Sequence, residues 1–309
     1  MRAVAVVGPT ATGKSALALA IASRFDGVII ACDSTAVYRG IDIGTDKVPT
    51  AEQRGIPHYL VDVADPRETY SAARYARDAA EVMHSTARAG HLPVLAGGTG
   101  FYYRALVRGL FPGPARDEDL RARLERVANR RGVEFLHRWL VRVDPDSGLR
   151  IQPRDLKRIV RALEVYLLTG RPLTAHFGET TSPIAGVDLL TIGVDMPREA
   201  LWPRVSRRVD DQFSRGVVDE VRRLLAAGVP SSAHAFSGLV YRQIVEMLAG
   251  VRDEPATREL IVRENMRYAR RQLIWFRKEP NVRWLQGPGE SDAVAAEACA
   301  LVEAFIASS

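Results

Sequence analysis

The stretch Gly8-Pro9-Thr10-Ala11-Thr12-Gly13-Lys14-Ser15 fits the phosphate-binding pattern G-x-x-x-x-G-K-[ST]. An apolar run at residues 3–7 precedes it and an alanine- and leucine-rich stretch at 16–22 follows, so we predict a strand, a glycine loop and a helix in succession. In this arrangement backbone N–H groups and the positive end of the helix dipole converge on one anion. The predicted polyphosphate site consists of Gly8, Thr10, Ala11, Thr12, Gly13, Lys14 and Ser15.

Two side chains of this loop are expected to contact the phosphate and its metal ion. Lys14 brings a positive charge to the terminal phosphate, and the Ser15 hydroxyl is a candidate ligand for Mg²⁺ shared with phosphate oxygens. The pattern does not name the reaction, because ATP-binding kinases and motors, GTPases and diphosphate-releasing transferases all use it. The rest of the chain has to distinguish among these classes.

Composition narrows the class of protein. The 309 residues, 47% of them apolar, suffice for one large or two modest domains, and no apolar run approaches the roughly 18 residues of a membrane helix. Cys32 and Cys299 are far apart and belong to no C-x-x-C motif, which favours a reduced, cytoplasmic setting. The net charge of +6 comes mainly from arginine. Arginine suits phosphates and stacked bases, although a genomic bias towards arginine codons explains the excess equally well.

Strand and helix patterns alternate along the first half of the chain. Apolar runs at 28–32, 57–63, 92–96 and 188–194 predict strands, and residues 70–89 have helical periodicity. The predicted fold is therefore α/β, of the P-loop type, with a parallel sheet and helices on both faces. Ligands of such sheets bind at the carboxyl ends of the strands, where the P-loop, Asp33 and Thr99 all lie.

A helical insertion interrupts this pattern. The Pro- and Gly-rich stretch 111–114 is followed by charged helices at about 117–144, and prolines 145 and 153 mark the far side. We therefore divide the chain into a first core part, residues 1–113, a helical insertion domain, residues 114–152, and a second core part, residues 153–309. Residues from 198 onward are predicted to be mostly helical.

Asp33 is the carboxylate at a strand end, and its position leaves three roles open. It can be a magnesium ligand, the cap of a turn or helix, or a general base. The strand at 92–96 ends in Gly97-Gly98-Thr99, which offers a hydroxyl where a kinase usually carries an aspartate for Mg²⁺. This strand end argues against a small-molecule kinase.

Residues 33–47, read with 8–15 and 97–102, closely resemble the tRNA dimethylallyltransferase (isopentenylpyrophosphate transferase) family, in its bacterial form without a zinc finger. The resemblance continues in family order through 152–165, 208–221 and 241–243, so it covers nearly the whole chain. It implies a nucleoside-kinase-like fold and a Mg²⁺-dependent transfer of a dimethylallyl group from dimethylallyl diphosphate to tRNA. The implied acceptor is the exocyclic amine of the adenosine 3′ of the anticodon, and diphosphate is released.

The resemblance also assigns roles to residues. The P-loop grips the diphosphate leaving group, Asp33 accepts the proton of the amine, and Thr99 and Arg208 act at the reacting diphosphate, with Arg207 as the alternative arginine. Family segments that contact tRNA match residues 157–161, 238–243 and 270–277. The resulting candidates for binding the tRNA anticodon stem-loop are Asp33, Ser34, Thr35, Ala36, Thr99, Lys157, Arg158, Arg161, Gly238, Tyr241, Arg242, Gln243, Arg270, Arg271, Gln272, Trp275 and Arg277.

Some of these assignments have simpler alternatives. In the insertion, Arg121 and Arg123 are further candidates for the anticodon stem, but a solvent-exposed amphipathic helix explains them as well. The arginines of the helix at 259–278 lie beside a stripe of core residues, and without the family they are read as a solvated face. A monomer is expected.

Two positions depart from the family pattern. Many relatives have glutamine where this chain has Ala36, and many have glycine where it has Val240. A β-branched residue does not readily take a positive φ, so the loop at Val240 is expected to differ in shape. The alternatives to tRNA prenylation are transfer to a free adenine nucleotide, a small-molecule kinase and a nucleic-acid-binding ATPase. The arginine-rich helices argue against the first, because a small acceptor needs no such surface.

Overall fold

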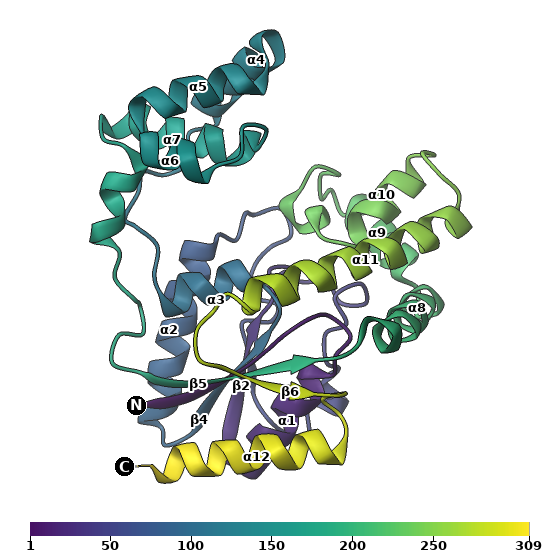
Figure 1. Ribbon diagram of the computed structural model, residues 1–309. Coiled ribbons are helices and arrows are strands. Elements are labelled where there is room, and N and C mark those ends of the chain that lie inside the picture. The colour runs from purple at the N-terminus through teal and green to yellow at the C-terminus, as the bar shows by residue number, and fades with distance from the viewer. Residues whose placement is uncertain (309) are drawn as a thin grey trace. The chain divides into compact units, whose positions relative to one another are not determined.

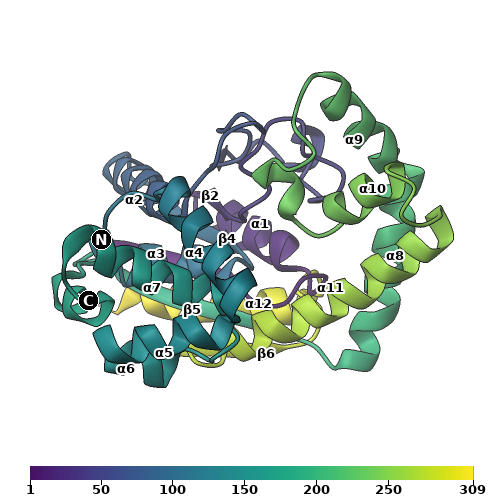
Figure 2. The same ribbon diagram turned by 90° about the horizontal axis from the view of Figure 1, so that it is seen from above.

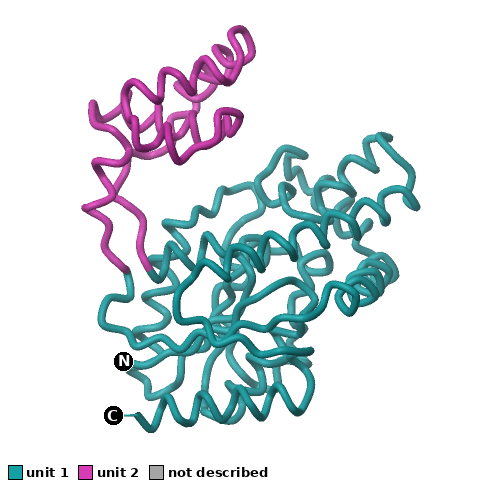
Figure 3. The backbone as a smooth tube through the Cα atoms, viewed as in Figure 1, with its two compact units in different colours: residues 1–107, 183–309 teal, residues 108–182 magenta. Residues whose placement is uncertain are grey.

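The computed structural model describes residues 1–308, which form two compact units. Unit 1 consists of residues 1–107 and 183–309, and unit 2 of residues 108–182 (Figure 3). The chain therefore leaves unit 1 once and returns to it once.

Across residues 1–308 the strands form one six-stranded sheet in the order β3-β2-β4-β1-β5-β6, and every pairing is parallel. The strands are β1 (Arg2–Val7), β2 (Gly27–Cys32), β3 (His58–Tyr59), β4 (Leu92–Gly97), β5 (Asp188–Asp195) and β6 (Val282–Gln286). The central strand β1 is buried from Ala3 to Val7, since helices cover both of its faces. The predicted parallel α/β sheet is confirmed.

Helices pack on both faces of the sheet (Figure 1). On one face α1 (Lys14–Arg24) contacts β1, β2 and β4, and α12 (Asp292–Ala307) packs against α1 and β6. On the other face α2 (Ala72–Arg88) contacts β2 and β4 and packs on α3 (Gly100–Val107). The core beneath α1 is fully apolar, and Val6, Leu17 and Ile21 within it have no exposed surface.

The remaining helices of unit 1 form a layer beyond the carboxyl ends of the strands (Figure 2). They are α8 (Arg198–Ser214), α9 (Val217–Ala226), α10 (Tyr241–Leu248) and α11 (Glu254–Phe276), with short 3-10 turns η1 (Thr50–Glu52) and η3 (His234–Ser237). The long α11 packs against α8, α10 and α3. Its apolar stripe is buried at Val262, Met266, Ala269 and Phe276, as the helical spacing predicts. These contacts fix α11 beside the sheet edge where the P-loop lies.

Unit 2 is a helical bundle with its own core. It contains α4 (Glu118–Arg131), α5 (Val133–Val143), α6 (Pro145–Arg150), α7 (Leu156–Thr169) and the 3-10 helix η2 (Leu173–Glu179). Residues of α4, α5 and α7 form one apolar cluster, so α7 belongs to this unit rather than to the core part that we began at residue 153. The buried Glu164 of α7 also accepts hydrogen bonds from Arg121 of α4 and from the N–H of Asp117.

Two strands differ from the sequence expectation. The run 57–63 forms only the two-residue β3, because Leu60 and Asp62 adopt positive φ and end it. Strand β6 was missed, since Val-Arg-Trp-Leu-Gln is short and charged, and only its pairing with β5 at the sheet edge makes it a strand. No helix among the described residues is long and apolar enough to cross a membrane.

Candidate functional site

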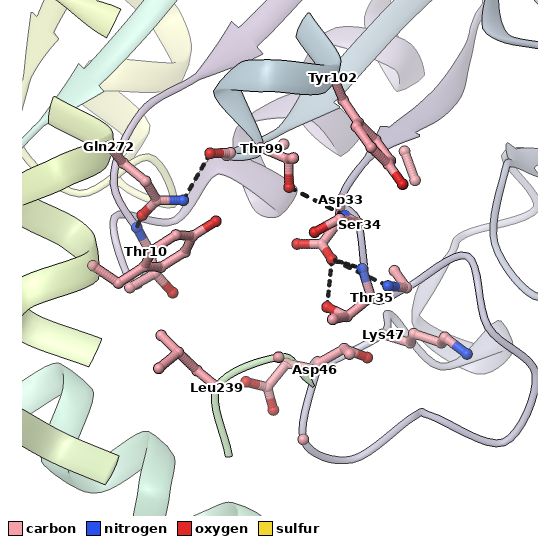
Figure 4. A pocket seen from close by; sticks show the side chains of 18 of the residues that line it. Thr10, Asp33, Ser34, Thr35, Asp46, Lys47, Thr99, Tyr102, Leu239 and Gln272 are labelled. Atoms are coloured by element: carbon pink, nitrogen blue, oxygen red, sulfur yellow. Dashed lines mark hydrogen bonds between the residues drawn. The ribbon is translucent and has the colours of Figure 1, made fainter. Parts of the chain in front are cut away.

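A cavity of about 920 Å³ lies in unit 1 at the carboxyl edge of the sheet. The register places Val7 of β1 and Cys32 of β2 on either side of Gly97 of β4. The loops that follow these three residues therefore meet at one place. Figure 4 shows Thr10 and Gln272 on one side of the cavity and Asp33, Ser34 and Thr35 on the other.

Positive charge predominates in the lining of this cavity. Six cationic side chains and three carboxylates line it, so its net charge favours an anionic ligand. The cations are Lys14, Lys47, Arg208, Arg242, Arg267 and Arg271, and the carboxylates are Asp33, Asp46 and Glu264.

The P-loop depends on two glycines. Gly8 has φ +138° and Gly13 has φ +82°, and a Cβ at Gly8 would lie 2.4 Å from the carbonyl oxygen of Val194. Gly13 is also the N-cap of α1, and no side chain caps this end of the helix. The amides of the first helical turn are therefore left for an anion, as the sequence predicts.

The outer side of the P-loop is supported by two segments that the sequence did not indicate. The N–H of Gly289 donates to the carbonyl of Thr12 at 2.8 Å. The Nε of Arg204 on α8 donates to the carbonyl of Ala11 at 2.7 Å, and the same guanidinium forms an ion pair with Glu290. These contacts lie outside the cavity and hold the loop in shape from behind.

Gln272 of α11 connects the P-loop with the turn after β4. Its Oε1 accepts a hydrogen bond from the N–H of Thr10 at 2.8 Å, and its Nε2 donates to the carbonyl of Gly98 at 2.9 Å (Figure 4). The side chain is buried, with 6% of its surface exposed. Gln272 thus lines the cavity, as a candidate should, but both ends of its amide are bonded to backbone.

Lys14 has an unusual titration. Burial and the positive charge of Arg208 lower the pKa of Lys14 to about 7, although Asp33 opposes the shift. Its Nζ donates to the carbonyl of Pro9. An anion in the cavity would reverse this shift, because a nearby negative charge favours the protonated amine.

The two oxygens of Asp33 have different surroundings. Oδ1 accepts hydrogen bonds from the N–H of Thr35 at 2.8 Å, from its hydroxyl at 2.6 Å and from the N–H of Ala36 at 3.1 Å. Oδ2 has no hydrogen bond among the described residues and lies on the cavity side (Figure 4). Asp33 therefore caps the turn with one oxygen and leaves the other for a ligand or a proton, so the capping role and the base role are compatible.

Thr99 faces Asp33 from the end of β4. Its Oγ1 accepts a hydrogen bond from the N–H of Ser34 at 3.1 Å, and its N–H donates to the carbonyl of Cys32 at 3.1 Å. Both bonds join the turn after β4 to the turn after β2. The two turns that carry the predicted catalytic residues Asp33 and Thr99 are thereby hydrogen-bonded to each other.

Of the two adjacent arginines on α8, Arg208 lines the cavity. Its Nη1 donates to the hydroxyl of Thr10 at 2.6 Å, and its Nε is paired with Asp46. Arg207 is exposed and does not line the cavity. The geometry therefore favours Arg208 over Arg207 as the arginine at the reacting group.

Many of the predicted residues do line this cavity. They are Thr10, Lys14, Ser15, Asp33, Ser34, Thr35, Ala36, Thr99, Arg208, Gly238, Arg242, Arg271 and Gln272. Ala36 supplies only a methyl group, and its N–H is bonded to Asp33. Gly8, Ala11, Thr12 and Gly13 form the loop without lining the cavity. Thr12 is fully buried and donates to the carbonyl of Pro9.

Tyr241 and Gln243 do not face the cavity, although we predicted both to contact RNA. Both side chains have no exposed surface. The hydroxyl of Tyr241 donates to Glu220 at 2.6 Å and accepts from the N–H of Gly44 at 2.9 Å, and Gln243 donates to Glu264 at 2.6 Å. In this structure they fix the loops around the cavity, and neither side chain has surface exposed for contact with RNA.

The last turns of α11 also contain side chains that are used within the protein. Trp275 packs on Gly100, where a Cβ would lie 2.4 Å from the indole, and the guanidinium of Arg104 stacks 4.3 Å from its ring centroid. Arg277 donates to Asp195 at 3.0 Å. Arg270 is exposed on the same helix. Arg277 is exposed as well, but its guanidinium is paired with Asp195, whereas no such pairing is seen for Arg270 among the described residues.

Five candidates belong to unit 2. Arg121 forms two hydrogen bonds with the buried Glu164, and Arg161 bonds both Glu164 and the carbonyl of Pro114. These two arginines hold the bundle together through contacts within unit 2, and their assignment to tRNA stays a prediction. The other three, Arg123, Lys157 and Arg158, are exposed, and Nε of Arg158 lies 3.4 Å from Oδ2 of Asp155.

Val240 contradicts the expectation drawn from its side chain. It has φ +75° and ψ −60°, a region that β-branched residues avoid, at the N-cap of α10. It is 3% exposed and lines the cavity. The loop therefore keeps the backbone conformation that suits glycine, and valine adopts it under strain.

Several lining residues were not predicted. They include Asp46, Tyr102, His234, Arg267 and Tyr268. The hydroxyl of Tyr38 accepts from the N–H of Tyr70 and is also hydrogen-bonded to Nδ1 of His234 at 3.0 Å. Asp46 lies within the stretch that carries the family resemblance, so a signal for it existed. Tyr102, in α3, also lies within such a stretch, residues 97–102. His234 comes from η3 and Arg267 and Tyr268 from α11, and only the folded chain brings these three to the cavity.

The residues present are compatible with a magnesium ion that uses substrate oxygens. No cluster of three or more histidine, cysteine or carboxylate side chains suited to a metal occurs among residues 1–308. Mg²⁺ commonly binds through one or two protein oxygens and completes its shell with phosphate and water. The exposed Ser15 hydroxyl at the P-loop fits that pattern.

Comparison with known proteins agrees with this geometry. The sequence model of the IPP transferase family matches residues 36–279. The tRNA dimethylallyltransferase of Solibacter usitatus is 45% identical, with 99% of each chain covered, and that of Thermomicrobium roseum is 46% identical, with 91% of this chain and 85% of the relative covered. The crystal structure of the full-length tRNA isopentenylpyrophosphate transferase from Bacillus halodurans is 35% identical and superposes with a TM-score of 0.72 over 99% of this chain and 95% of the other. The chain therefore belongs to the IPP transferase family.

Proposed function

We propose that this enzyme transfers a dimethylallyl group from dimethylallyl diphosphate to the exocyclic amine of the adenosine 3′ of the anticodon in tRNA, and releases diphosphate. The observation that carries the proposal is the pairing, within one cavity, of the cationic P-loop with the unbonded oxygen of Asp33. The first suits a diphosphate leaving group, and the second suits a proton acceptor.

In the proposed reaction the allylic C–O bond breaks and its electrons pass to the diphosphate. Lys14 and Arg208 line the cavity, and their charges would stabilise the diphosphate as its negative charge develops. The same lining includes Leu239, Tyr102 and the Ala36 methyl group, which can accept a short branched hydrocarbon. Mg²⁺ held by Ser15 and diphosphate oxygens would neutralise further charge when bound.

The amine supplies the electrons of the new C–N bond and must lose a proton. Asp33 Oδ2 would accept this proton, because Oδ1 is already held by three hydrogen bonds and fixes the orientation of the carboxylate. An adenine amine is a weak nucleophile, so a base aligned in advance would contribute much of the rate. Thr99, joined to the Asp33 turn through Ser34, would stay in register with it.

A tRNA acceptor accounts for the cations at the cavity that the diphosphate does not need. Arg242, Arg267 and Arg271 line it from α10 and α11, and all three are exposed. An adenosine must leave the anticodon stack to enter a cavity, at a cost of a few kcal/mol, and phosphate contacts by these arginines would offset that cost. We propose a monomer that acts where tRNA is found, in the cytoplasm.

The test is a comparison of acceptors. The enzyme is incubated with dimethylallyl diphosphate and Mg²⁺, together with an unmodified anticodon stem-loop, with AMP, or with ATP alone. The proposal expects a prenylated stem-loop and released diphosphate. A stem-loop with inosine at the same position, which lacks the amine, should stay unmodified. Prenylated AMP with an unmodified stem-loop, or phosphate released from ATP alone, would contradict the proposal.

A further inference from the structure

Asp46 is a carboxylate inside a cavity whose other features favour an anion. Its Oδ2 is paired with Nε of Arg208, the arginine that also donates to Thr10 of the P-loop. Figure 4 shows Asp46 at the wall of the cavity beside Leu239. A negative charge at this place repels a bound diphosphate. The contacts of Asp46 within the protein indicate what the carboxylate does instead.

The structure around Asp46 is built to hold this carboxylate in place. Gln212, one turn after Arg208 on α8, donates its Nε2 to Asp46 Oδ2 at 2.9 Å and to the carbonyl of Gly44 at 3.2 Å. Gln212 is 1% exposed, and its own Oε1 has no partner among the described residues. A buried amide that leaves its acceptor unbonded is oriented entirely towards Asp46 and the segment that carries it.

The rest of that segment is anchored in the same way. The buried carboxylate of Glu220 accepts from the N–H groups of Asp42 and Ile43, and the buried hydroxyl of Tyr241 accepts from the N–H of Gly44. Side chains of α8, α9 and α10 thus fix residues 42–46 from behind. The carboxylate of Asp46 is therefore held in a defined position by the hydrogen bonds of its own segment.

The guanidinium of Arg208 is held at two of its nitrogens. Asp46 takes Nε, and Thr10 takes Nη1, so the plane and the direction of the group are set before any substrate enters. The N–H groups that remain on Nη1 and Nη2 are available for an anion on the P-loop. A fixed fork of donors stabilises developing phosphate charge better than one that must reorganise.

We propose that Asp46 is a positioning residue that aims Arg208 at the leaving diphosphate, and that Gln212 holds Asp46 for this role. The inference rests on the proposed function. It assigns Asp46 no contact with substrate. Removal of Asp46 should therefore lower the rate of the chemical step, because Arg208 loses its alignment. Diphosphate binding should not weaken, because the same substitution removes a negative charge from the cavity.

The test is a double-mutant cycle on full-length enzyme with dimethylallyl diphosphate and the stem-loop. Asp46→Ala should lower kcat by about tenfold to a hundredfold and change KM for dimethylallyl diphosphate by less than about threefold. Asp46→Asn keeps an acceptor for Nε and should stay within about threefold of wild type. Once Arg208→Ala is present, adding Asp46→Ala should have no further effect. Arg215 forms ion pairs with both Asp46 and the exposed Asp211 of α8. Asp211→Ala, which removes the other carboxylate from Arg215, is therefore the matched control and should leave kcat unchanged.

Additive effects of the two substitutions, or an Asp46→Ala enzyme with wild-type kcat, would overturn the inference. A lowered Tm together with equal losses in Asp46→Asn and Asp46→Ala would also overturn it, since that pattern indicates a merely structural role. The NMR signal of the Arg208 Nε–H, assigned by its loss in Arg208→Lys, gives a readout without turnover. It should be protected from exchange in wild type and in Asp46→Asn, and lost in Asp46→Ala. This signal separates failure of the inference from failure of the proposed function.

Discussion

The amide of Gln272 is bonded at 2.8 Å to the backbone N–H of Thr10 in the P-loop, 262 positions away in the sequence. The other end of the same amide is bonded to Gly98, just before Thr99. One buried side chain of α11 thus fixes the distance between the phosphate loop and the turn that carries a candidate catalytic residue. This relationship distinguishes Gln272 from a residue that merely touches RNA.

Substitution of Gln272 by alanine is expected to impair use of the small substrate rather than of the RNA. It leaves the Thr10 N–H and the Gly98 carbonyl without partners, a loss of about 1–3 kcal/mol. The kcat/KM for dimethylallyl diphosphate should fall by about tenfold to a hundredfold, with KM for the stem-loop little changed. Steady-state kinetics with each substrate varied in turn provides the measurement. Ile274→Ala, at an exposed site two residues later, is the control. A raised KM for the stem-loop alone would instead support an RNA contact.

At position 240 a glycine variant should be more stable than an alanine variant, the reverse of the usual order. Both Val240→Ala and Val240→Gly lose the same buried methyl groups, but only alanine keeps a Cβ at φ +75°. Glycine is normally less stable than alanine by about 0.5–1 kcal/mol, whereas here it should be more stable by about 1 kcal/mol. Thermal or denaturant unfolding of the two variants decides the matter. If the alanine variant is the more stable, the loop carries no strain.

Lys14 makes diphosphate binding depend on pH. Its pKa in the empty site is about 7, and a bound diphosphate should raise it. Below pH 7 the amine is already charged, so binding takes up no proton there. Between pH 7 and the higher pKa of the complex, binding takes up a proton and the affinity falls as the pH rises. Calorimetry at pH 8 in buffers of different ionisation enthalpy should show uptake by wild type and much less by Lys14→Arg. Equal proton uptake by both proteins would assign it to the diphosphate itself.

Glu164 should stabilise unit 2, through its buried pairs with Arg121 and Arg161. Burial raises the pKa of Glu164, but the hydrogen bonds of the two arginines outweigh it and bring the pKa to about 2, from an ordinary value of 4.5. A lowered pKa of this kind stabilises the fold fully above pH 4.5, and the stabilisation is lost as the pH falls from there towards 2. Glu164→Gln should destabilise the unit by about 3 kcal/mol at pH 7.

Hydrogen exchange of the amides in α4 and α7 measures this effect within unit 2 alone. Arg121→Ala should accelerate exchange as Glu164→Gln does. Arg123→Ala, on the same helix but exposed, should leave exchange unchanged. An equal effect of Arg121→Ala and Arg123→Ala would return Arg121 to the surface role that the sequence first assigned to it.

The parts of the site that are local in sequence could be predicted from it. The spacing of Gly8, Gly13 and Lys14 predicts a phosphate-binding loop. Asp33 directly follows one strand and Thr99 comes shortly after another. Because the strands are parallel, these two residues meet at one edge of the sheet. The sheet itself followed from alternating apolar runs. Strand β6 did not, because its identity depends on pairing with β5.

The direction in which a side chain points could not be predicted. Arg121 and Arg123 are two residues apart on one helix, yet the first is bonded to a buried glutamate and the second is exposed. Tyr241 lies in a family motif, but its hydroxyl is used by Glu220 and Gly44. Sequence patterns identify which residue types occur together, whereas the partner of each depends on long-range packing that only the folded chain shows.

The central claim is that Asp33 accepts the proton of the adenine amine while the P-loop holds the departing diphosphate. It is tested most directly by the single-turnover rate of stem-loop prenylation in wild type and Asp33→Asn, with both substrates saturating. Asparagine can keep the turn bonded to Thr35 but cannot accept the proton, so the rate should fall by at least about a hundredfold while binding of both substrates is retained. A single-turnover rate within about twofold of wild type would contradict the account.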